Sequence, residues 1–528
     1  LPSSTSGFDF KLNTSSPLWD VSIGNVASNQ FLTTEVLATT ILNDLSINVG
    51  SEFRANGLDL FIGRNFINNN ISASPGIDFG GFKPGSITQT TTFNGTGFQQ
   101  ISGSGSNLTN FANLTIDAGS TVALLTNSEL RVNNRLNLKS GTFNDGENII
   151  SVIGNIINTA NHSSPTNLGG IRLAGVQTQV LSGVGATYGN IIIDNSSGVS
   201  MVNNTTINGR LTFTNGSLYI DDYLLTFGEI ASIGGLPDKS KMILLNGVLS
   251  DQGVRKQFPA GASAPFTVPI GVSGKFTPAT YQINASSASG SIVVRPVNRC
   301  HPAVVRPGDD NALLSYWSVD SIGFGSPFSI NHSYQYVPED VRPIVNEDIT
   351  YVVGHYRTRD YAWSDLGDSG TPGTVNEGAR TISIDNANFI YGDVTAGGNL
   401  NFTPPLDIFY SLVANGNWTD PNSWSLESHI GTPATYAPFG NPVRIASGHT
   451  IHLNEDGQYS VSVQVDGTLD CGNTVFHNLG TVFGTGKINI TSTPEGFFVF
   501  PGGYFDEFFA TPGTTLEFMG TNTASLPL

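Results

Sequence analysis

Two histidines near the C-terminal end of the sequence are the first candidates for metal or acid–base chemistry. His449 and His452 stand three residues apart in a run that alternates apolar and polar residues. An odd offset in a β-strand points two side chains to opposite faces, so these histidines are not expected to hold one metal ion together. The acids Glu455 and Asp456 follow in a predicted loop before Gly457. We therefore expect one imidazole to face inward and the other to face solvent.

The acidic residues offer little support for hydrolytic or lyase chemistry. A β-helical polysaccharide lyase or glycosidase needs paired carboxylates or metal-binding acids, together with a base, along one groove. The adjacent pairs Asp309-Asp310 and Asp221-Asp222 are isolated from each other, and aspartate is common in turns for local reasons. No third acid follows either pair at a regular loop spacing. We interpret both pairs as turns and expect no cofactor, with calcium left open.

Aromatic residues beside charged ones could bind sugars. Trp363 ends a short run that also holds Arg357, Arg359, Asp360 and Tyr361. A guanidinium next to aromatic rings can stack on a sugar or bind its carboxylate, whereas an ion pair at a hairpin tip is the plainer alternative. Trp363 and Trp418 are the candidate glycan contacts.

The two cysteines, Cys300 and Cys471, lie far apart and indicate neither a disulfide framework nor a zinc site.

The composition limits the classes of partner. The chain has 528 residues with 61 glycines, only 12% charged residues, and a formal net charge of −18. Nucleic acid is disfavoured as a partner, because phosphate binding needs a basic face. No run of about 18 apolar residues occurs, so no membrane-spanning helix is expected. The 10% aromatic content argues against disorder.

The elements that must position these residues repeat along the chain. Residues 93–103 align without gaps on 173–183, and residues 113–117 return as 190–194. Within each copy apolar residues alternate, and the breaks between runs are Asn-Gly, Ser-Gly and Asp-Gly. This pattern predicts an all-β fold of β-solenoid repeats, with about three coils of ~20–30 residues in each copy. The residues predicted to face inward include Leu114, Ile116, Leu136, Leu138, Ile191, Ile193, Leu211 and Phe213. One β-sandwich per copy is the alternative.

Three modules are expected. Residues 1–244 carry the β-solenoid repeats, and residues 245–404, rich in aromatic residues between turns, predict an intervening Ig-like antiparallel β-sandwich. Residues 405–528 return to the alternating pattern and predict a second solenoid. There, Phe518, Gly520 and Leu526 repeat the spacing of residues 93, 95 and 101. Because a solenoid cut within a repeat exposes a strand edge, we expect this module to continue beyond residue 528.

A resemblance to a known group of proteins rests on three segments. Residues 415–424 (NGNWTDPNSW), 443–450 (VRIASGHT) and 465–470 (VDGTLD) are similar to a module of very large secreted proteins of the Bacteroidota, and to the start of G8-type β-helical domains. Residues 257–363 resemble the β-sandwich that interrupts solenoid repeats in those proteins. The resemblance implies export by the type 9 secretion system to the cell surface, as adhesins, gliding components or fibres. Asp320-Ser321-Ile322 resembles the O-glycan acceptor of the same group, which makes Ser321 a candidate glycosylation site.

The sequence therefore predicts a non-catalytic, extracellular structural or adhesive segment of a very large surface protein. The expected partners are neighbouring repeats of the same chain, surface glycans and the secretion machinery. Two alternatives stay open: a carbohydrate-active β-helix enzyme, either a polysaccharide lyase or a glycosidase, and a glycan-binding module.

Overall fold

The computed structural model describes residues 8–24, 30–70, 81–103, 108–125, 129–304, 312–342, 351–358, 362–364, 373–398, 402, 407–494 and 498–520. The protein is nearly all β, with 52% strand and 2% helix. Its sheets are largely parallel, which confirms the predicted β-solenoid and rejects tandem sandwiches as the repeating unit. Two compact units divide the chain: unit 1 comprises Leu1–Gly247, Asp251–Arg295 and Ser321–Phe328, and unit 2 comprises the remaining residues.

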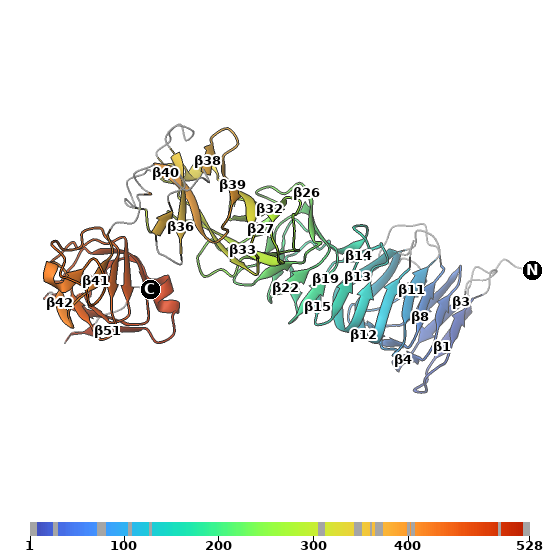
Figure 1. The fold of residues 1–528 in the computed structure, drawn as a ribbon. Coiled ribbons are helices and arrows are strands. Elements are labelled where there is room, and N and C mark those ends of the chain that lie inside the picture. Colours follow the sequence, from blue (N-terminus) through green and yellow to red (C-terminus); the bar gives the residue numbers. More distant parts are fainter. Residues whose placement is uncertain are drawn as a thin grey trace, which may run out of the picture. The chain divides into compact units, whose positions relative to one another are not determined.

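Unit 1 is a stack of coils in which each coil contributes one strand to each of three faces (Figure 1). Face 1 consists of β1 (Phe8–Leu12), β3 (Gln30–Thr34), β6 (Ser51–Arg54), β9 (Phe82–Lys83), residues 108–111 of β12 (Leu108–Leu124), residues 129–132 of β13 (Glu129–Asn144), β14 (Ile149–Val152), β17 (Gly170–Leu173), β20 (Ile191–Asp194), β23 (Arg210–Asn215) and β26 (Ser232–Gly235).

The other two faces are built in the same way. Face 2 consists of β4 (Thr39–Ile41), β7 (Leu60–Ile62), β10 (Thr90–Phe93), the middle parts of β12 and β13, β15 (Asn155–Asn158), β18 (Gln179–Ser182), β21 (Val199–Met201), β24 (Leu218–Tyr219), β27 (Ile243–Leu244) and β30 (Ile270–Val272). Face 3 consists of β2 (Val21–Ile23), β5 (Leu45–Ile47), β8 (Asn65–Asn68), β11 (Gln99–Gly103), the last parts of β12 and β13, β16 (Asn161–Ser163), β19 (Ala186–Tyr188), β22 (Thr205–Ile207), β25 (Leu225–Phe227) and β28 (Val254–Phe258).

The strand register gives the length of a coil and corrects the interpretation of the repeat. On face 1, Ile150 pairs with Ile171, Ile171 with Ile191 and Ile191 with Leu211. These steps are at the short end of the ~20–30 residues expected for one coil. Leu114 lies on face 2, where it pairs with Leu136, whereas its sequence counterpart Ile191 lies on face 1. The two copies of the sequence repeat are therefore separated by three coils and part of a fourth, which is not a whole number of coils. The repeat arises because strands and corners on different faces have similar sequences.

The interior of the coils is apolar, as the alternation predicts. All eight residues expected to face inward are buried, with at most 2% of their surface exposed. Aromatic rings from successive coils also meet inside: Phe66 lies 5.4 Å from Phe111 and 5.5 Å from Phe82 between ring centroids. Because every second residue of a short strand points inward, each coil adds one or two apolar side chains per face to a continuous core.

Parallel pairing continues past residue 244, and antiparallel strands follow. β25 pairs with β28 and β27 with β30 in parallel register, while the opposite edge of β28 pairs antiparallel with β33 (Gly290–Val297). Further antiparallel pairs join β29 (Phe266–Val268) to β32 (Ala279–Ala285), and β30 to β31 (Lys275–Phe276). One antiparallel set consists of β34 (Tyr316–Ile322), whose residues up to Asp320 belong to unit 2, with β36 (Tyr351–Arg357), β37 (Ala362–Ser364) and β40 (Gly392–Gly398). A second set in unit 2 consists of β35 (Ser329–Gln335), β38 (Gly373–Asn376) and β39 (Thr381–Ala387). A 3-10 turn, η1 (Pro338–Asp340), follows β35.

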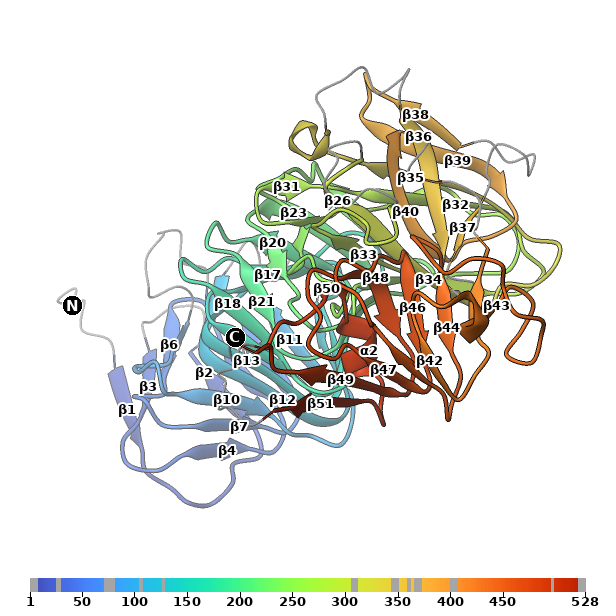
Figure 2. The ribbon, with the colours of Figure 1, turned by 90° about the vertical axis from the view of Figure 1, so that its left-hand side faces the viewer.

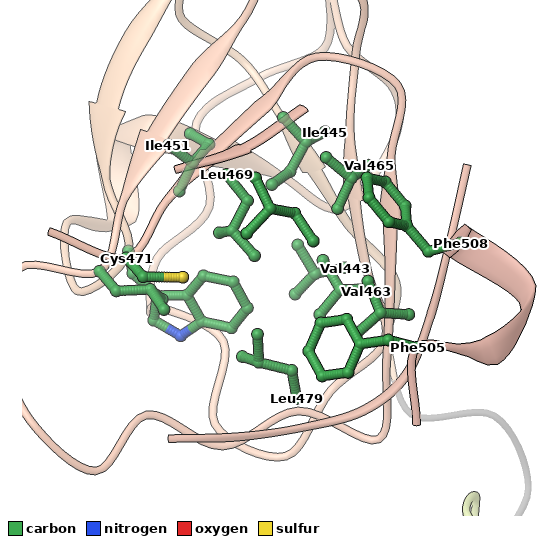
Figure 3. Close-up of a cluster of buried hydrophobic side chains, with 14 of the residues drawn as sticks. Val443, Ile445, Ile451, Val463, Val465, Leu469, Cys471, Leu479, Phe505 and Phe508 are labelled. Atoms are coloured by element: carbon green, nitrogen blue, oxygen red, sulfur yellow. The ribbon is translucent and has the colours of Figure 1, made fainter. Parts of the chain in front are cut away.

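Parallel coils resume in unit 2. One sheet orders β43 (Trp424–Ser425), β41 (Phe409–Ser411), β44 (Val443–Ile445), β46 (Ser462–Val465), β48 (Asn478–Phe483) and β50 (Gly502–Tyr504), and the other orders β42 (Asn415–Asn417), β45 (Thr450–His452), β47 (Thr468–Asp470), β49 (Lys487–Thr491) and β51 (Thr515–Met519). Figure 3 shows their apolar side chains, such as Val443, Val463 and Leu469, converging between the two sheets. Helix α2 (Asp506–Ala510) adds Phe508, which is fully buried in this core.

Candidate functional site

The Asn-Trp…Trp segment, residues 415–424, forms the first edge of the C-terminal coils. After β42 the chain turns through η3 (Pro421–Ser423), where the Asp420 carboxylate accepts a hydrogen bond from the Asn422 amide at 2.9 Å. β43 then runs antiparallel beside β41, at the edge of its sheet. The Trp424 indole donates to the Trp418 carbonyl oxygen at 2.9 Å, and the two rings meet edge to face. This segment therefore closes the apolar interior of the first coil.

Neither candidate glycan contact presents a ring face to solvent. Trp418 has no exposed surface, and Trp363 exposes 5%. The Trp363 indole donates to the Ala303 carbonyl oxygen at 2.8 Å, and its ring packs against Tyr356 and Phe402. A sugar stacks only on a ring that it can reach, so these two tryptophans act as core residues in the described structure.

A serine and two histidines meet next to this segment. The Ser411 hydroxyl lies 2.8 Å from His449 Nδ1 and also accepts the Ala446 amide at 3.0 Å. His429 Nδ1 lies 2.9 Å from the Ser411 carbonyl oxygen. A serine beside a histidine is the pairing used in nucleophilic catalysis, but a nucleophile must reach its substrate. Ser411 is fully buried, so this cluster links β41 to two loops rather than offering a reactive hydroxyl.

His452 bridges three successive coils on the outer surface of the second sheet. Its Nδ1 lies 2.8 Å from Asp470 Oδ2, and its Nε2 lies 2.6 Å from Asn415 Oδ1. The same Asp470 accepts the Gly472 amide through Oδ1 at 3.1 Å. Asn415, His452 and Asp470 belong to β42, β45 and β47, which pair in this order. Both ring nitrogens are engaged, so the ring has no free lone pair for acid–base work in this geometry.

Buried histidine–aspartate pairs occur in both units. His301 Nε2 lies 3.1 Å from Asp393 Oδ2, and Tyr316, Tyr356 and Trp363 surround the imidazole with centroids 4.7–4.9 Å away. In unit 1, His162 Nε2 lies 3.3 Å from Asp145 Oδ2, and both side chains have no exposed surface. Each Nδ1 accepts a backbone amide, from Ala303 and Gly189 respectively, which fixes the proton on Nε2 facing the carboxylate. Both imidazoles are buried, and each lies against a carboxylate from another part of the chain.

The other candidates from the sequence have structural positions or lie outside the described residues. Asp222 accepts a hydrogen bond from Asn246 at 3.1 Å in a corner where Asp221 has a φ of 45°. Asp456 accepts the Val475 amide at 2.8 Å, in the loop expected there. Ser321 is half-exposed near the end of β34, so its glycosylation stays a prediction. The candidates outside the described residues are Asp309, Asp310, Arg359, Asp360, Tyr361 and Leu526.

Both thiols are held protonated. Burial raises the pKa of Cys300 to about 11, and burial together with the neighbouring Asp470 carboxylate raises the pKa of Cys471 to about 12. A thiol reacts and binds metals as the thiolate, so neither cysteine is activated. Among the described residues, no three His, Cys, Asp or Glu side chains are placed to share a metal ion.

Two glutamines inside the coils have a role that the sequence analysis did not assign. Gln99 Oε1 accepts the Gly95 amide at 2.9 Å, and its Nε2 donates to the carbonyl oxygen of Ile62 at 2.9 Å. Gln179 repeats both contacts, with the Gly175 amide at 2.7 Å and the Val152 carbonyl oxygen at 3.0 Å. The signal was present, because each glutamine stands four residues after a glycine in both aligned segments.

Comparison of the chain with protein-family models, with curated proteins and with solved structures finds no match. In the part of the chain that the structure describes, no helix is long and apolar enough to cross a bilayer.

Proposed function

We propose that this chain is a non-catalytic structural or adhesive segment of a very large extracellular surface protein. The observation that supports this role most directly is the use of polar side chains as ties between coils. Ser411 and His449, and Asn415, His452 and Asp470, are the strongest acid–base constellations of the C-terminal coils, and each joins neighbouring strands. These two clusters therefore offer neither a free base nor an exposed nucleophile for catalysis.

The coil architecture suits a load-bearing or spacing element. In a stack of coils each turn contacts only its neighbours, so length is added without a change of fold. The backbone hydrogen bonds between coils run along the stacking direction, and the apolar interior continues from coil to coil. The extracellular location is supported by the resemblance of residues 415–424 and 443–450 to surface proteins of the Bacteroidota.

The experiment that tests this role compares cleavage with binding. The purified chain is incubated with neutral and acidic polysaccharides, and the polymer length is followed by size-exclusion chromatography together with reducing-end release. We expect no change in polymer length. Shortening of any polymer by the wild-type chain that is lost in a His452→Ala or Ser411→Ala variant of unchanged fold would overturn the proposal. An Asn454→Ala variant, in the loop after β45, serves as the control.

A further inference from the structure

Face 1 of unit 1 carries a row of outward side chains that follows the stacking direction. Strand register places Asn110, Arg131, Ser151, Arg172, Ile192, Thr212 and Gly234 opposite one another on successive coils. Arg210 stands two residues before Thr212 on β23 and so points to the same side of the sheet. Arg131 and Arg172 therefore stand two coils apart in one row, and Arg210 follows two coils later, displaced by two residues, or about 7 Å, along its strand. Figure 2 shows β17, β20 and β23, which carry this part of the row, side by side.

These three arginines differ from the other cations of the same face. Toward the N-terminal coils, Lys11 pairs with Asp9 at 2.9 Å, and Arg54 pairs with Glu52 at 2.8 Å. Lys83 shares Glu52 at 4.0 Å. Within the described part of the chain, the structure gives no ion pair to Arg131, Arg172 or Arg210. Arg131 bonds the Asn133 amide oxygen and Arg172 the Ser151 hydroxyl, both of which are neutral.

The local packing lays these side chains along the sheet. Arg172 donates to Ser151 in the preceding coil at 2.7 Å, so its guanidinium extends along the row. A Cβ atom on Gly234 would lie 2.4 Å from Arg210 Nε and 2.6 Å from the Thr212 hydroxyl, so the glycine leaves the space that Arg210 occupies. Arg131, Arg172 and Arg210 are all half-exposed. The three arginine side chains are thus half-exposed on one side of the sheet, with neutral residues between them, of which Ser151 is itself buried.

We propose that this arginine row binds an extended acidic polysaccharide lying along the stacking direction. Arginine binds carboxylate and sulfate groups through two parallel hydrogen bonds, which suits uronic acids and sulfated sugars. Two coils correspond to about 10 Å, since neighbouring strands lie about 4.8 Å apart. A polymer whose negative charges are widely spaced suits cations that lie about 10 Å apart. Double-stranded DNA, with one charge per about 1.7 Å, would instead meet three cations on a chain of net charge −18.

This inference deepens the proposed adhesive role and rests on it, because the polysaccharide is held and not cleaved. It names the class of ligand and the face that takes it. The alternative for each arginine is a purely structural one, in which its aliphatic stem covers apolar surface and the charge merely meets water. If the arginines form a binding site, the affinity for the polysaccharide depends on where these charges lie. If they are only structural, the affinity depends on the number of charges removed and not on their positions.

The test uses the full chain and polygalacturonate, with dextran as the neutral polymer and double-stranded DNA as a dense polyanion. The variant Arg131→Gln/Arg172→Gln/Arg210→Gln is compared with Arg64→Gln/Arg135→Gln/Lys139→Gln, which removes the same charge outside face 1. Titration calorimetry at two salt concentrations measures affinity, circular dichroism checks folding, and chromatography measures polymer length. The variant Arg131→Lys/Arg172→Lys/Arg210→Lys keeps the charge and loses the paired hydrogen bonds, and covers the case in which the glutamine variant does not fold.

We expect the wild-type chain to bind polygalacturonate but not dextran, more weakly at higher salt. The face 1 glutamine variant should bind at least tenfold more weakly, the matched control within twofold of wild type, and the lysine variant in between. Equal losses in both glutamine variants, no binding by the wild-type chain, or tighter binding of DNA through the same arginines would each overturn the inference. Polymer shortening would instead overturn the proposed non-catalytic role, so the two failures are distinguishable.

Discussion

At the scale of single residues, histidine serves this chain mainly as a buried hydrogen-bonding group. His162, His301, His332, His355 and His477 are buried, which is five of the eight histidines. A buried imidazole keeps two polar atoms to satisfy, so it can hold a neighbouring strand in place. At His332, His355 and His477, burial also lowers the pKa. Such a core should be sensitive to mild acid.

His332 gives the clearest pH prediction. Burial, with a smaller contribution from His355, lowers the pKa of His332 to about 3, and burial also lowers the pKa of His355. The unfolded chain binds a proton near pH 6.5, whereas folded His332 does not, so folding is fully favoured above pH 6.5 and weakens as the pH falls toward 3. We expect unit 2 to lose about 1.4 kcal/mol per pH unit from His332 in this window. Urea unfolding followed by the near-ultraviolet signal between pH 7 and 4.5 measures it.

A His332→Phe variant is the control for that prediction. It removes the titrating group but leaves an aromatic ring in the core, so the curve of stability against pH should be shallower than that of the wild-type chain. Tyr334, whose hydroxyl lies 2.9 Å from His332 Nδ1, loses one partner in the variant, which lowers stability at every pH by a similar amount. An unchanged slope would contradict the assignment to His332.

The paired tryptophans allow a matched comparison at the same scale. The Trp424 indole N–H donates to the Trp418 carbonyl oxygen, whereas the Trp418 indole N–H has no acceptor among the described residues. Both rings are fully buried. Trp424→Phe should therefore cost about 1–3 kcal/mol more than Trp418→Phe, because only the former leaves a buried carbonyl without its donor. Thermal unfolding of the two variants gives the difference, and a larger cost for Trp418→Phe would contradict the argument.

At the scale of elements, the sequence allowed the strands and their inward faces to be predicted but not their placement on the three faces. Alternation identifies which residues of a strand point inward, and Leu114 and Ile191 are both buried as expected. The strands of all three faces look alike in sequence, however, because each is a short alternating run ended by a corner. Only the register places Leu114 and Ile191 on different faces. The arginine row could not be predicted for the same reason, since it depends on the exact length of every coil between Arg131 and Arg210.

The hydrogen-bonded clusters of the C-terminal coils could not be predicted from the sequence either. Ser411 and His449 lie 38 residues apart in the chain, and Asn415 and His452 lie 37 residues apart. No spacing rule connects them until the coils are stacked. The environment of the tryptophans could not be fixed from the sequence for a related reason. An aromatic residue near a turn is compatible with a core, which is the plainer interpretation, and with a ligand platform, and the packing of Trp418 against Trp424 places that ring in the core.

The internal glutamines lead to a prediction about the corners. Gln179 joins the Gly175 amide of its own corner to the Val152 carbonyl oxygen of the preceding coil. In Gln179→Leu the Gly175 amide stays buried without a partner, whereas the Val152 carbonyl oxygen keeps its hydrogen bond from the Ala174 amide at 2.9 Å. The variant should therefore cost about 1–3 kcal/mol. Gln177→Leu, two residues away and exposed, should change stability by less than about 0.5 kcal/mol. Hydrogen exchange should show faster exchange at Gly175 in the first variant only, and equal effects of the two would refute the role of Gln179.

At the scale of the whole molecule, we expect each coil to be stabilised mainly by its contacts with the two adjacent coils, and not by the chain as one cooperative unit. Within the three faces of unit 1, most strands pair with the strands one coil before and one coil after them, and the inward side chains meet those of the same two coils. A defect in one coil should therefore spread along the stack for a short distance and then stop. Hydrogen-bonded residues such as Ser411 and His449 are far apart in the sequence but lie on the same coil or on neighbouring coils. Their contacts therefore do not carry a defect further along the stack.

Ile191 and Ile192 provide the test, since adjacent residues of β20 point to opposite sides of face 1. Ile191 is fully buried between Ile171 and Leu211, whereas Ile192 is half-exposed between Arg172 and Thr212. Ile191→Asn removes apolar contacts and buries an amide without a partner, which should cost about 4 kcal/mol, whereas Ile192→Asn should cost less than about 1 kcal/mol. Hydrogen exchange read by mass spectrometry should show lost protection in residues 149–235 for Ile191→Asn, decaying with each coil from β20, while β5 and β7 keep wild-type rates. Uniform loss of protection across unit 1 would mean that the coils unfold as one cooperative block, and the nearest-neighbour account of this solenoid would then be wrong.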